Sequence, residues 1–134
     1  PPGPKVQNPE FEVVERMTRE LPAGSFVIAP RKVSVHLSLV HGFTRPVIAK
    51  RVFFSGEEED RRLALRDATS RWSKEPFGDR RTQWLIRELD HYRVDGLVTT
   101  RVTLATRGLR RALRKAGFKP FAKADRYRLW KRVE

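Results

Sequence analysis

The chain has 134 residues, 39% of them hydrophobic and 34% charged, and its net charge at pH 7 is +13. It contains no cysteine, which excludes disulfides, thiolate metal sites and a cysteine nucleophile. Because cysteine is missing and no apolar run approaches the roughly 18 residues of a membrane span, we expect an intracellular protein of the cytoplasm, the nucleoid or the nucleus.

The length favours one domain with a modest hydrophobic core. We expect residues 1–10 to be a flexible Pro-rich tail and residues 11–134 to be a single compact domain. Within it, residues 11–78 are predicted as a half built from a hairpin and helices, and residues 79–134 as a basic half. The mixture of helix and strand patterns predicts an α/β fold of the α+β type.

The first half is predicted to contain a helix and two strands. Apolar residues of "FEVVERMTREL" recur at intervals of three, three and four, which predicts an amphipathic helix over 11–21. Apolar and polar residues alternate in "KVSVHLSLV", which predicts a half-buried strand over 32–40. The turn residues "HGFTRP" follow, and a second apolar run predicts a strand over 47–54. The two strands are expected to pair as an N-terminal β-hairpin.

Two helices are predicted after this hairpin. Ser55 and the acid three residues later have the spacing of a capping box, which predicts a helix over 55–72. Asp79 is expected to cap the second helix, 80–94, and Asp95-Gly96 is expected to end it.

The last part of the chain is predicted as a strand, a helix and a small hairpin. The β-branched run 97–104 predicts a strand or an extended connection. Thr106 is expected to cap a helix over 107–116, and Gly117 is the expected glycine after its C-terminus. Residues 118–133 are predicted to form two short strands around "AKAD".

The positive charge is concentrated in this last part. Residues 101–134 contain twelve Lys or Arg and two acids, which gives +10 of the total of +13. A helical wheel of 107–116 separates the apolar side chains from the four arginines. The two sides are Leu109, Ala112, Leu113 and Ala116 against Arg107, Arg110, Arg111 and Arg114. Because like charges on one side repel, we expect either an anionic partner or acids supplied from elsewhere in the fold.

The order of a helix, a connection, the helix "TRGLRRALRKAGF" and a basic wing ending "RYRLWKR" resembles a winged helix-turn-helix over about residues 80–133. In that family the second helix of the motif enters the major groove and the wing touches the backbone. The resemblance implies a nucleic-acid-binding surface on the basic helix (107–116) and the basic wing (118–133). In "YRLWKR", Trp130 is the aromatic residue expected to face outward, where it can stack on unpaired bases. The expected contact residues are Arg107, Arg110, Arg111, Arg114, Lys115, Lys119, Lys123, Arg126, Arg128, Trp130 and Lys131.

We therefore expect a non-catalytic nucleic-acid-binding protein whose partner is double-stranded DNA ahead of RNA. An RNA-binding protein of the ribosome or of another assembly is an alternative with the same charge. The nearly neutral N-terminal half is expected to contact a protein partner or to form a homodimer. No membrane partner, catalytic residue, metal or cofactor is expected.

Two enzyme classes are further alternatives. The stretch "VTLATRGLRRALRKAGFKPF" also resembles the end of GNAT-type acetyltransferases, in which a strand, a helix and a Gly-Phe pair precede the final hairpin. That family holds a pyrophosphate on a Gly-rich turn, whereas no two glycines of this chain lie within three residues of each other. A small metal-free ribonuclease would use His36 and His41 for acid–base work. An exposed histidine on the polar face of a strand is the simpler interpretation of His36.

Overall fold

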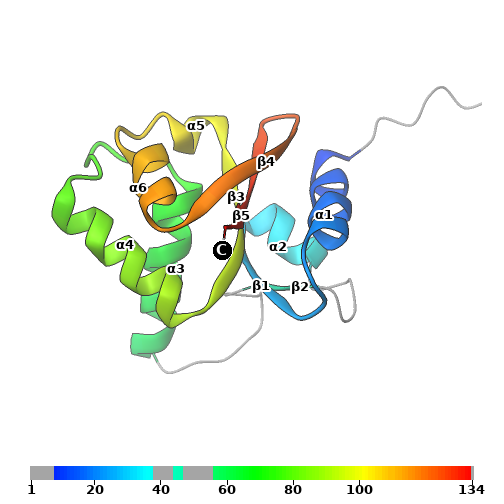
Figure 1. Cartoon of the computed structure of the whole chain (residues 1–134), viewed down its shortest axis with the longest axis horizontal. Coiled ribbons are helices and arrows are strands. Elements are labelled where there is room, and N and C mark those ends of the chain that lie inside the picture. The colour runs from blue at the N-terminus through cyan, green and yellow to red at the C-terminus, as the bar shows by residue number, and fades with distance from the viewer. Residues whose placement is uncertain (1–7, 38–43, 47–55, 134) are drawn as a thin grey trace, which may run out of the picture.

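The computed structural model describes residues 8–37, 44–46 and 56–133. It contains a five-stranded mixed sheet with helices on both faces (Figure 1). The helices are α1 (Pro9–Glu20), α2 (Arg31–Leu37), α3 (Gly56–Ser70), α4 (Asp79–His91), α5 (Arg101–Leu104) and α6 (Leu109–Lys115). The strands are β1 (Ser25–Ile28), β2 (Thr44–Pro46), β3 (Val94–Thr100), β4 (Phe118–Ala124) and β5 (Tyr127–Arg132). The expected α+β class is confirmed.

The strands lie in the order β2-β1-β3-β5-β4. Strand β1 is parallel to both of its neighbours, β2 and β3, whereas β5 is antiparallel to both β3 and β4. Strands β4 and β5 form the C-terminal hairpin, which confirms the two short strands predicted at this end. Gly117, between α6 and β4, has φ +92 and so occupies the left-handed position expected after a helix.

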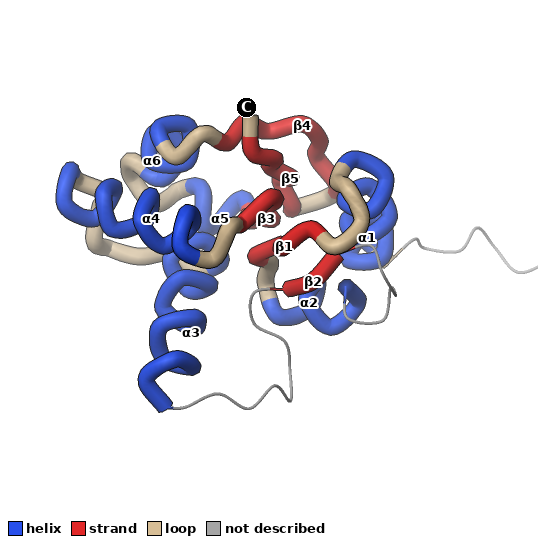
Figure 2. The backbone as a smooth tube through the Cα atoms, turned by 60° about the horizontal axis from the view of Figure 1, so that its bottom comes forward, coloured by secondary structure: helices blue, strands red, loops and turns tan. Residues whose placement is uncertain are grey.

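The two faces of the sheet belong to two different cores. Leu97 of β3 packs with Leu85 of α4 and Leu113 of α6, while the next residue, Val98, packs with Met17 of α1. Helices α3, α4 and α6 accordingly lie on one side of the sheet and α1 and α2 on the other (Figure 2). Alternate side chains of the central strands therefore point into one core or the other, and neither face is left to solvent.

The predicted N-terminal hairpin is wrong in its first strand, because residues 31–37 form α2. The carbonyl oxygen of Pro30 accepts hydrogen bonds of 2.9 Å from the N–H groups of Val33 and Ser34 at the start of this helix. Since β1 and β2 are parallel, they need a crossover connection, and α2 lies in that connection. The predicted second strand, 47–54, lies outside the described residues.

The two predicted helices of the first half are present with shifted ends. Helix α1 begins at Pro9, inside the expected tail, because the side chain of Asn8 caps it by accepting a hydrogen bond of 2.9 Å from the N–H of Glu10. Helix α3 begins at Gly56 and ends at Ser70. The predicted cap, Ser55, lies outside the described residues.

The expected ends of α4 are wrong at both termini. Gly78 is the N-cap of this helix and Asp79 its first residue, and the helix stops at His91. Arg93 then takes φ 51 and turns the chain into β3. Asp95 and Gly96 consequently lie within the strand.

Gly96 serves the packing of α1 rather than the end of a helix. A Cβ atom added to Gly96 would lie 2.6 Å from Cδ1 of Leu21 and 2.9 Å from Cε of Met17. Only a residue without a side chain lets α1 approach β3 this closely.

Candidate nucleic-acid interface

Helix α6 has one apolar and one cationic side, as the helical wheel predicts. Leu109, Ala112 and Leu113 are at most 1% exposed and pack into the core that α4 shares. The exposed side chains around them are those of Arg110, Arg111, Arg114 and Lys115, together with Arg107 in the preceding turn. These five residues are called the α6 cationic surface below.

The α6 cationic surface has no acidic partner in the part of the chain that the structure describes. None of its side chains makes a hydrogen bond or an ion pair with a described residue. The three acids nearest in sequence have other partners. Asp90 lies 3.2 Å from Arg132, Asp95 accepts a hydrogen bond of 3.0 Å from the N–H of Phe26, and Asp125 lies 3.4 Å from Arg126. Among the described residues, acids from elsewhere in the fold therefore do not neutralise this surface.

The turn that leads into α6 is held by the loop between α3 and α4. The N–H of Phe77 donates to the carbonyl oxygen of Arg107 over 2.9 Å. Thr106 is not the cap of α6 as predicted, since its Oγ1 accepts a hydrogen bond of 3.0 Å from the N–H of Ser73. The N-cap is Gly108, which has φ +87, and a Cβ atom added there would lie 2.7 Å from the carbonyl oxygen of Phe77. The backbone that carries Arg107 is thus fixed from two sides.

An open hollow of about 520 Å³ lies at the same turn. Arg107, Arg110 and Arg111 line it, together with the backbone between α5 and α6. A guanidinium group offers five N–H donors in a planar fork and stays charged at any physiological pH, so it suits phosphate oxygens. The hollow is therefore a place where a phosphate group can meet several arginines at once.

Cationic side chains lie directly opposite each other at two positions of the C-terminal hairpin. Lys123 is paired with Arg128, and Lys119 with Lys131. Paired residues point to the same face, and Arg128 lies two residues from Trp130, which packs into the core beside α6. The Lys123–Arg128 pair is thus on the face that α6 covers, and the Lys119–Lys131 pair is on the face that α1 covers. Like charges in such pairs repel each other unless an anion lies between them.

Arg126 and Lys131 are paired with acids of α1. Nη2 of Arg126 lies 3.2 Å from Oε2 of Glu10, and its Nη1 lies 3.4 Å from Oδ2 of Asp125. The ammonium group of Lys131 binds the carboxylate of Glu20. These two predicted contact residues therefore connect the hairpin to α1, and they are not grouped with the α6 cationic surface.

The outward orientation predicted for Trp130 is wrong. Its side chain is 2% exposed, and its Nε1–H donates to Oγ1 of Thr99 over 2.9 Å. Alternation along β5 does place Trp130 opposite to Tyr127 and Leu129, but helices cover both faces of the strand. An aromatic side chain that points away from one core consequently enters the other, and it has no access to a base.

Arg61 and Arg62 of α3 differ from the arginines of α6 because they bind acids. Arg61 binds Glu88 through two hydrogen bonds of 2.8 and 2.7 Å. Arg62 binds Glu58 over 2.8 Å, and the same carboxylate accepts a hydrogen bond of 2.9 Å from the hydroxyl of Tyr92. The hydrogen bond from Arg61 holds the pKa of Glu88 below its ordinary value of 4.5, and that from Arg62 does the same for the pKa of Glu58. These contacts connect α3 to α4.

The sequence analysis did not single out Arg101, which is a further exposed arginine. It is exposed at the start of α5, and its N–H donates to the carbonyl oxygen of Arg126 over 2.9 Å. This hydrogen bond places it beside the turn of the C-terminal hairpin. The available signal was that Arg101 is the first residue of the basic segment.

The histidines do not assemble a reactive site in the described ranges. His36 lies in α2 rather than on the polar face of a strand, and His41 lies outside the described residues. His91 packs edge-on against Tyr92 with ring centroids 4.7 Å apart. Among residues 8–37, 44–46 and 56–133, no three His, Asp or Glu side chains gather as a metal ion would require.

No protein-family model matches the sequence, and no curated protein matches it. Of the helices in the described ranges, none has the length and apolar character needed to cross a membrane. Function is therefore inferred from the geometry and charge of the described residues.

Proposed function

We propose that the protein binds double-stranded DNA without catalysis, through the α6 cationic surface and the neighbouring Lys123–Arg128 pair. The observation that carries this proposal is the group of five exposed cationic residues without an acidic partner among the described residues. Duplex DNA supplies one negative charge per roughly 1.7 Å of its axis and releases condensed counterions when such residues bind it. The partner that relieves the repulsion within this surface is then a polyanion.

The arrangement of the elements supports the resemblance to winged helix-turn-helix domains. Helix α4, strand β3, helices α5 and α6 and the hairpin β4–β5 follow one another, with strands in the order β3-β5-β4. In that family the second helix of the motif enters the major groove and the hairpin contacts the backbone. We propose these two roles for α6 and for β4–β5. Strands β1 and β2 and helices α1 and α2 are additions, and the two helices cover the face of the sheet opposite to α6.

The size of α6 limits how much sequence the protein reads. Its seven residues, at about 1.5 Å each, give a helix of roughly 10 Å, which spans about three base pairs. Because Trp130 is buried, the hairpin supplies no stacking contact of the kind expected. We infer that phosphate contacts provide most of the affinity and that base recognition is limited to a few positions.

RNA is the second candidate partner because the same charges attract it. The major groove of A-form RNA is deep and narrow, so α6 would have to lie on the backbone or in the shallow minor groove. Duplex DNA, whose major groove admits a helix, fits the element order better. Binding in an assembly of structured RNA is therefore the outcome that the experiment below must separate from DNA binding.

The expected protein contact of the N-terminal half stays a prediction. Phe11 of α1, which is 61% exposed, is the residue through which a protein partner or a second copy of the chain would most simply bind. DNA binding also requires the intracellular location expected from the sequence.

A fluorescence anisotropy titration tests the proposal. Labelled duplex DNA, single-stranded DNA and a folded RNA of equal length are titrated with the protein at one fixed salt concentration. We expect the lowest dissociation constant for duplex DNA. Tighter binding to folded RNA would replace DNA by RNA as the partner, and absence of binding to all three would refute the proposal.

A further inference from the structure

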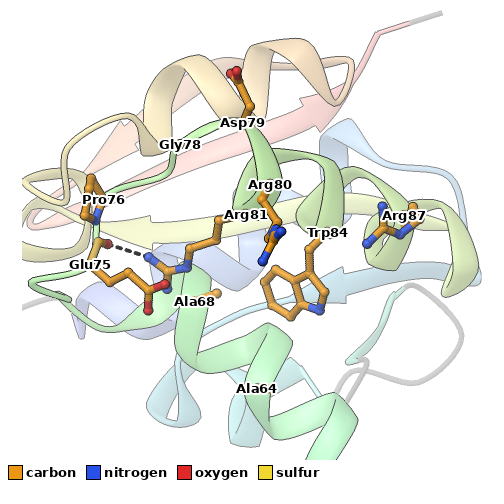
Figure 3. A pocket seen from close by; sticks show the side chains of 10 residues that line it. All are labelled: Ala64, Ala68, Glu75, Pro76, Gly78, Asp79, Arg80, Arg81, Trp84 and Arg87. Atoms are coloured by element: carbon orange, nitrogen blue, oxygen red, sulfur yellow. Dashed lines mark hydrogen bonds between the residues drawn. The ribbon is translucent and has the colours of Figure 1, made fainter.

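A second arginine-rich feature lies on α4, on the opposite side of that helix from α6 (Figure 3). It is a groove of about 810 Å³ between α3 and α4, called the α3–α4 groove below. Its volume falls in the range of about 300–1,000 Å³ that is typical of ligand sites. Its lining residues are Ala64, Ala68, Glu75, Pro76, Gly78, Asp79, Arg80, Arg81, Trp84 and Arg87.

Trp84 gives the groove a flat aromatic wall. Its indole is half-buried and packs on one side against the core of α3, α4 and α6. Across the groove, α3 presents only the methyl groups of Ala64 and Ala68, so the ring is not covered by a large side chain (Figure 3). A planar ring of a ligand can occupy this space and stack on the indole.

Three arginines surround this wall. Nη1 of Arg81 donates to the carbonyl oxygen of Glu75 over 2.6 Å, and its guanidinium carbon lies 4.0 Å from the centre of the Phe77 ring. Arg81 is therefore held in place before any ligand arrives. Arg80 and Arg87 are exposed on either side of the indole, and neither forms an ion pair with a described residue (Figure 3).

The acids that line the groove do not neutralise the positive charge near the indole. The carboxylate of Asp79 points away from Trp84, and Glu75 lies at the far end of the groove, beyond Arg81 (Figure 3). Near the indole the charged groups are thus those of Arg80 and Arg87. An apolar flat wall flanked by cations is complementary to a ligand that combines an aromatic ring with an anionic group.

We propose that the α3–α4 groove binds a nucleotide, with its base stacked on Trp84 and its phosphate held by Arg80 and Arg87. The ligand is either a free mononucleotide or an unpaired nucleotide at the end of a nucleic-acid strand, since both carry the same ring and the same anion. Trp84, Arg80 and Arg87 lie on the side of α4 opposite to α6, so the nucleotide site is distinct from the proposed DNA surface. The loop 75–78 lines one end of the groove and also contacts the turn before α6 through the hydrogen bond from Phe77 to Arg107.

The test uses the tryptophan fluorescence of the full chain. Adenosine 5′-monophosphate, adenosine and inorganic phosphate are added separately, and we expect saturable quenching by the nucleotide, weaker binding of adenosine and still weaker binding of phosphate. Trp84→Leu should abolish the quenching, whereas Trp72→Phe should preserve it because Trp72, 51% exposed, does not line the groove. Quenching that is absent in the parent protein, or equal in Trp84→Leu, would overturn the proposal.

A second pair of double variants tests the site while leaving Trp84 unchanged. Arg80→Gln with Arg87→Gln changes two exposed side chains and should raise the dissociation constant of the nucleotide about tenfold or more. Arg31→Gln with Lys32→Gln removes the same charge from α2, on the other side of the sheet, and should leave nucleotide binding unchanged. Equal loss in both pairs would mean attraction by net charge alone and would refute a defined site.

Competition with two kinds of duplex identifies the source of the ligand. A variant of α6 then separates this site from the DNA surface. A duplex with a single-stranded overhang should displace the nucleotide better than a blunt duplex if the site takes strand ends, and no better if it takes free nucleotides. Arg111→Glu with Arg114→Glu should lose duplex binding and keep nucleotide binding. Loss of nucleotide binding in that variant would contradict a separate site. Binding of a glutamate-rich peptide to the groove without binding of nucleotides would mean that the ligand is an acidic peptide and not a nucleotide.

Discussion

The N–H of Phe77 donates a hydrogen bond of 2.9 Å to the carbonyl oxygen of Arg107. Through this bond the loop between α3 and α4 fixes the turn from which α6 begins. The cationic side chains around the turn therefore have a rigid base, and an anion does not have to order the backbone before it binds.

Gly108→Ala should loosen this base. Gly108 has φ +87, and its added Cβ would lie 2.7 Å from the carbonyl oxygen of Phe77. Both the backbone conformation and the contact oppose the substitution, so we expect a loss of more than about 1 kcal/mol in the free energy of unfolding. Urea denaturation measures it. Gly56→Ala is the matched control, because nothing lies within 4 Å of its added Cβ, and a similar loss there would contradict the explanation.

The sequence was sufficient to predict α6 and the C-terminal hairpin. The spacing of Leu109 and Leu113 against the arginines is a local pattern, and it decides which side of the helix is buried. Gly117 and the turn before β5 are local signals too. These elements need no knowledge of distant parts of the chain.

The errors occur where the fold depends on contacts between distant segments. Residues 33–37 alternate like a strand, yet the parallel pairing of β1 with β2 requires a connection in which α2 forms. Trp130 could not face solvent on either side of β5, because the core beside α6 covers one face of the strand and α1 packs on the opposite face. The α3–α4 groove likewise combines residues 64–68 with 80–87, and no pattern in the sequence says that these two helices are adjacent.

Glu88→Gln should lower the stability of the folded protein near neutral pH but not in acid. Glu88 is 6% exposed, and its hydrogen bonds from Arg61 hold its pKa below 4.5. A depressed pKa stabilises the fold above the unfolded pKa, and this contribution is lost as the pH falls through the folded value. We expect the melting temperature of the variant to lie a few degrees below the parent at neutral pH and to approach it in acid. Glu15→Gln is the matched control because Glu15 is exposed and forms no ion pair with a described residue, and an equal loss of melting temperature there would contradict the role of the Arg61 contact.

Both tyrosines should titrate late. Burial raises the pKa of Tyr127 to about 12, and burial also raises that of Tyr92 to about 12. The unfolded tyrosine ionises near 10.0, so stability is retained below that pH and is lost as the pH rises through the folded values. Ultraviolet titration of the tyrosinate band should show little ionisation in the folded protein at pH values where the urea-unfolded chain is already ionised. Coincident titration curves for the two states would contradict the raised pKa values of the two tyrosines.

Duplex binding should depend steeply on salt. If the α6 cationic surface and the Lys123–Arg128 pair engage about four to six phosphates, the logarithm of the binding constant should fall with the logarithm of salt with a slope of about −4 to −5. Anisotropy titrations at several salt concentrations give this slope. A slope near zero would mean that phosphate contacts contribute little and that the proposed surface is not where DNA binds.

The duplex titration of Arg111→Glu with Arg114→Glu, set beside Arg31→Glu with Lys32→Glu, tests the DNA proposal most directly. Both double variants reverse two exposed charges, but only the first changes α6, and the second lies on the helix layer across the sheet. We expect the α6 variant to lose duplex binding while its free energy of unfolding changes by less than about 0.5 kcal/mol, and the α2 variant to bind nearly as the parent does. Leu113→Ala, by contrast, should lower stability by about 2–5 kcal/mol because that side chain is fully buried. Duplex binding that persists in the α6 variant, or falls equally in both, would contradict the assignment of α6 as the DNA-binding surface.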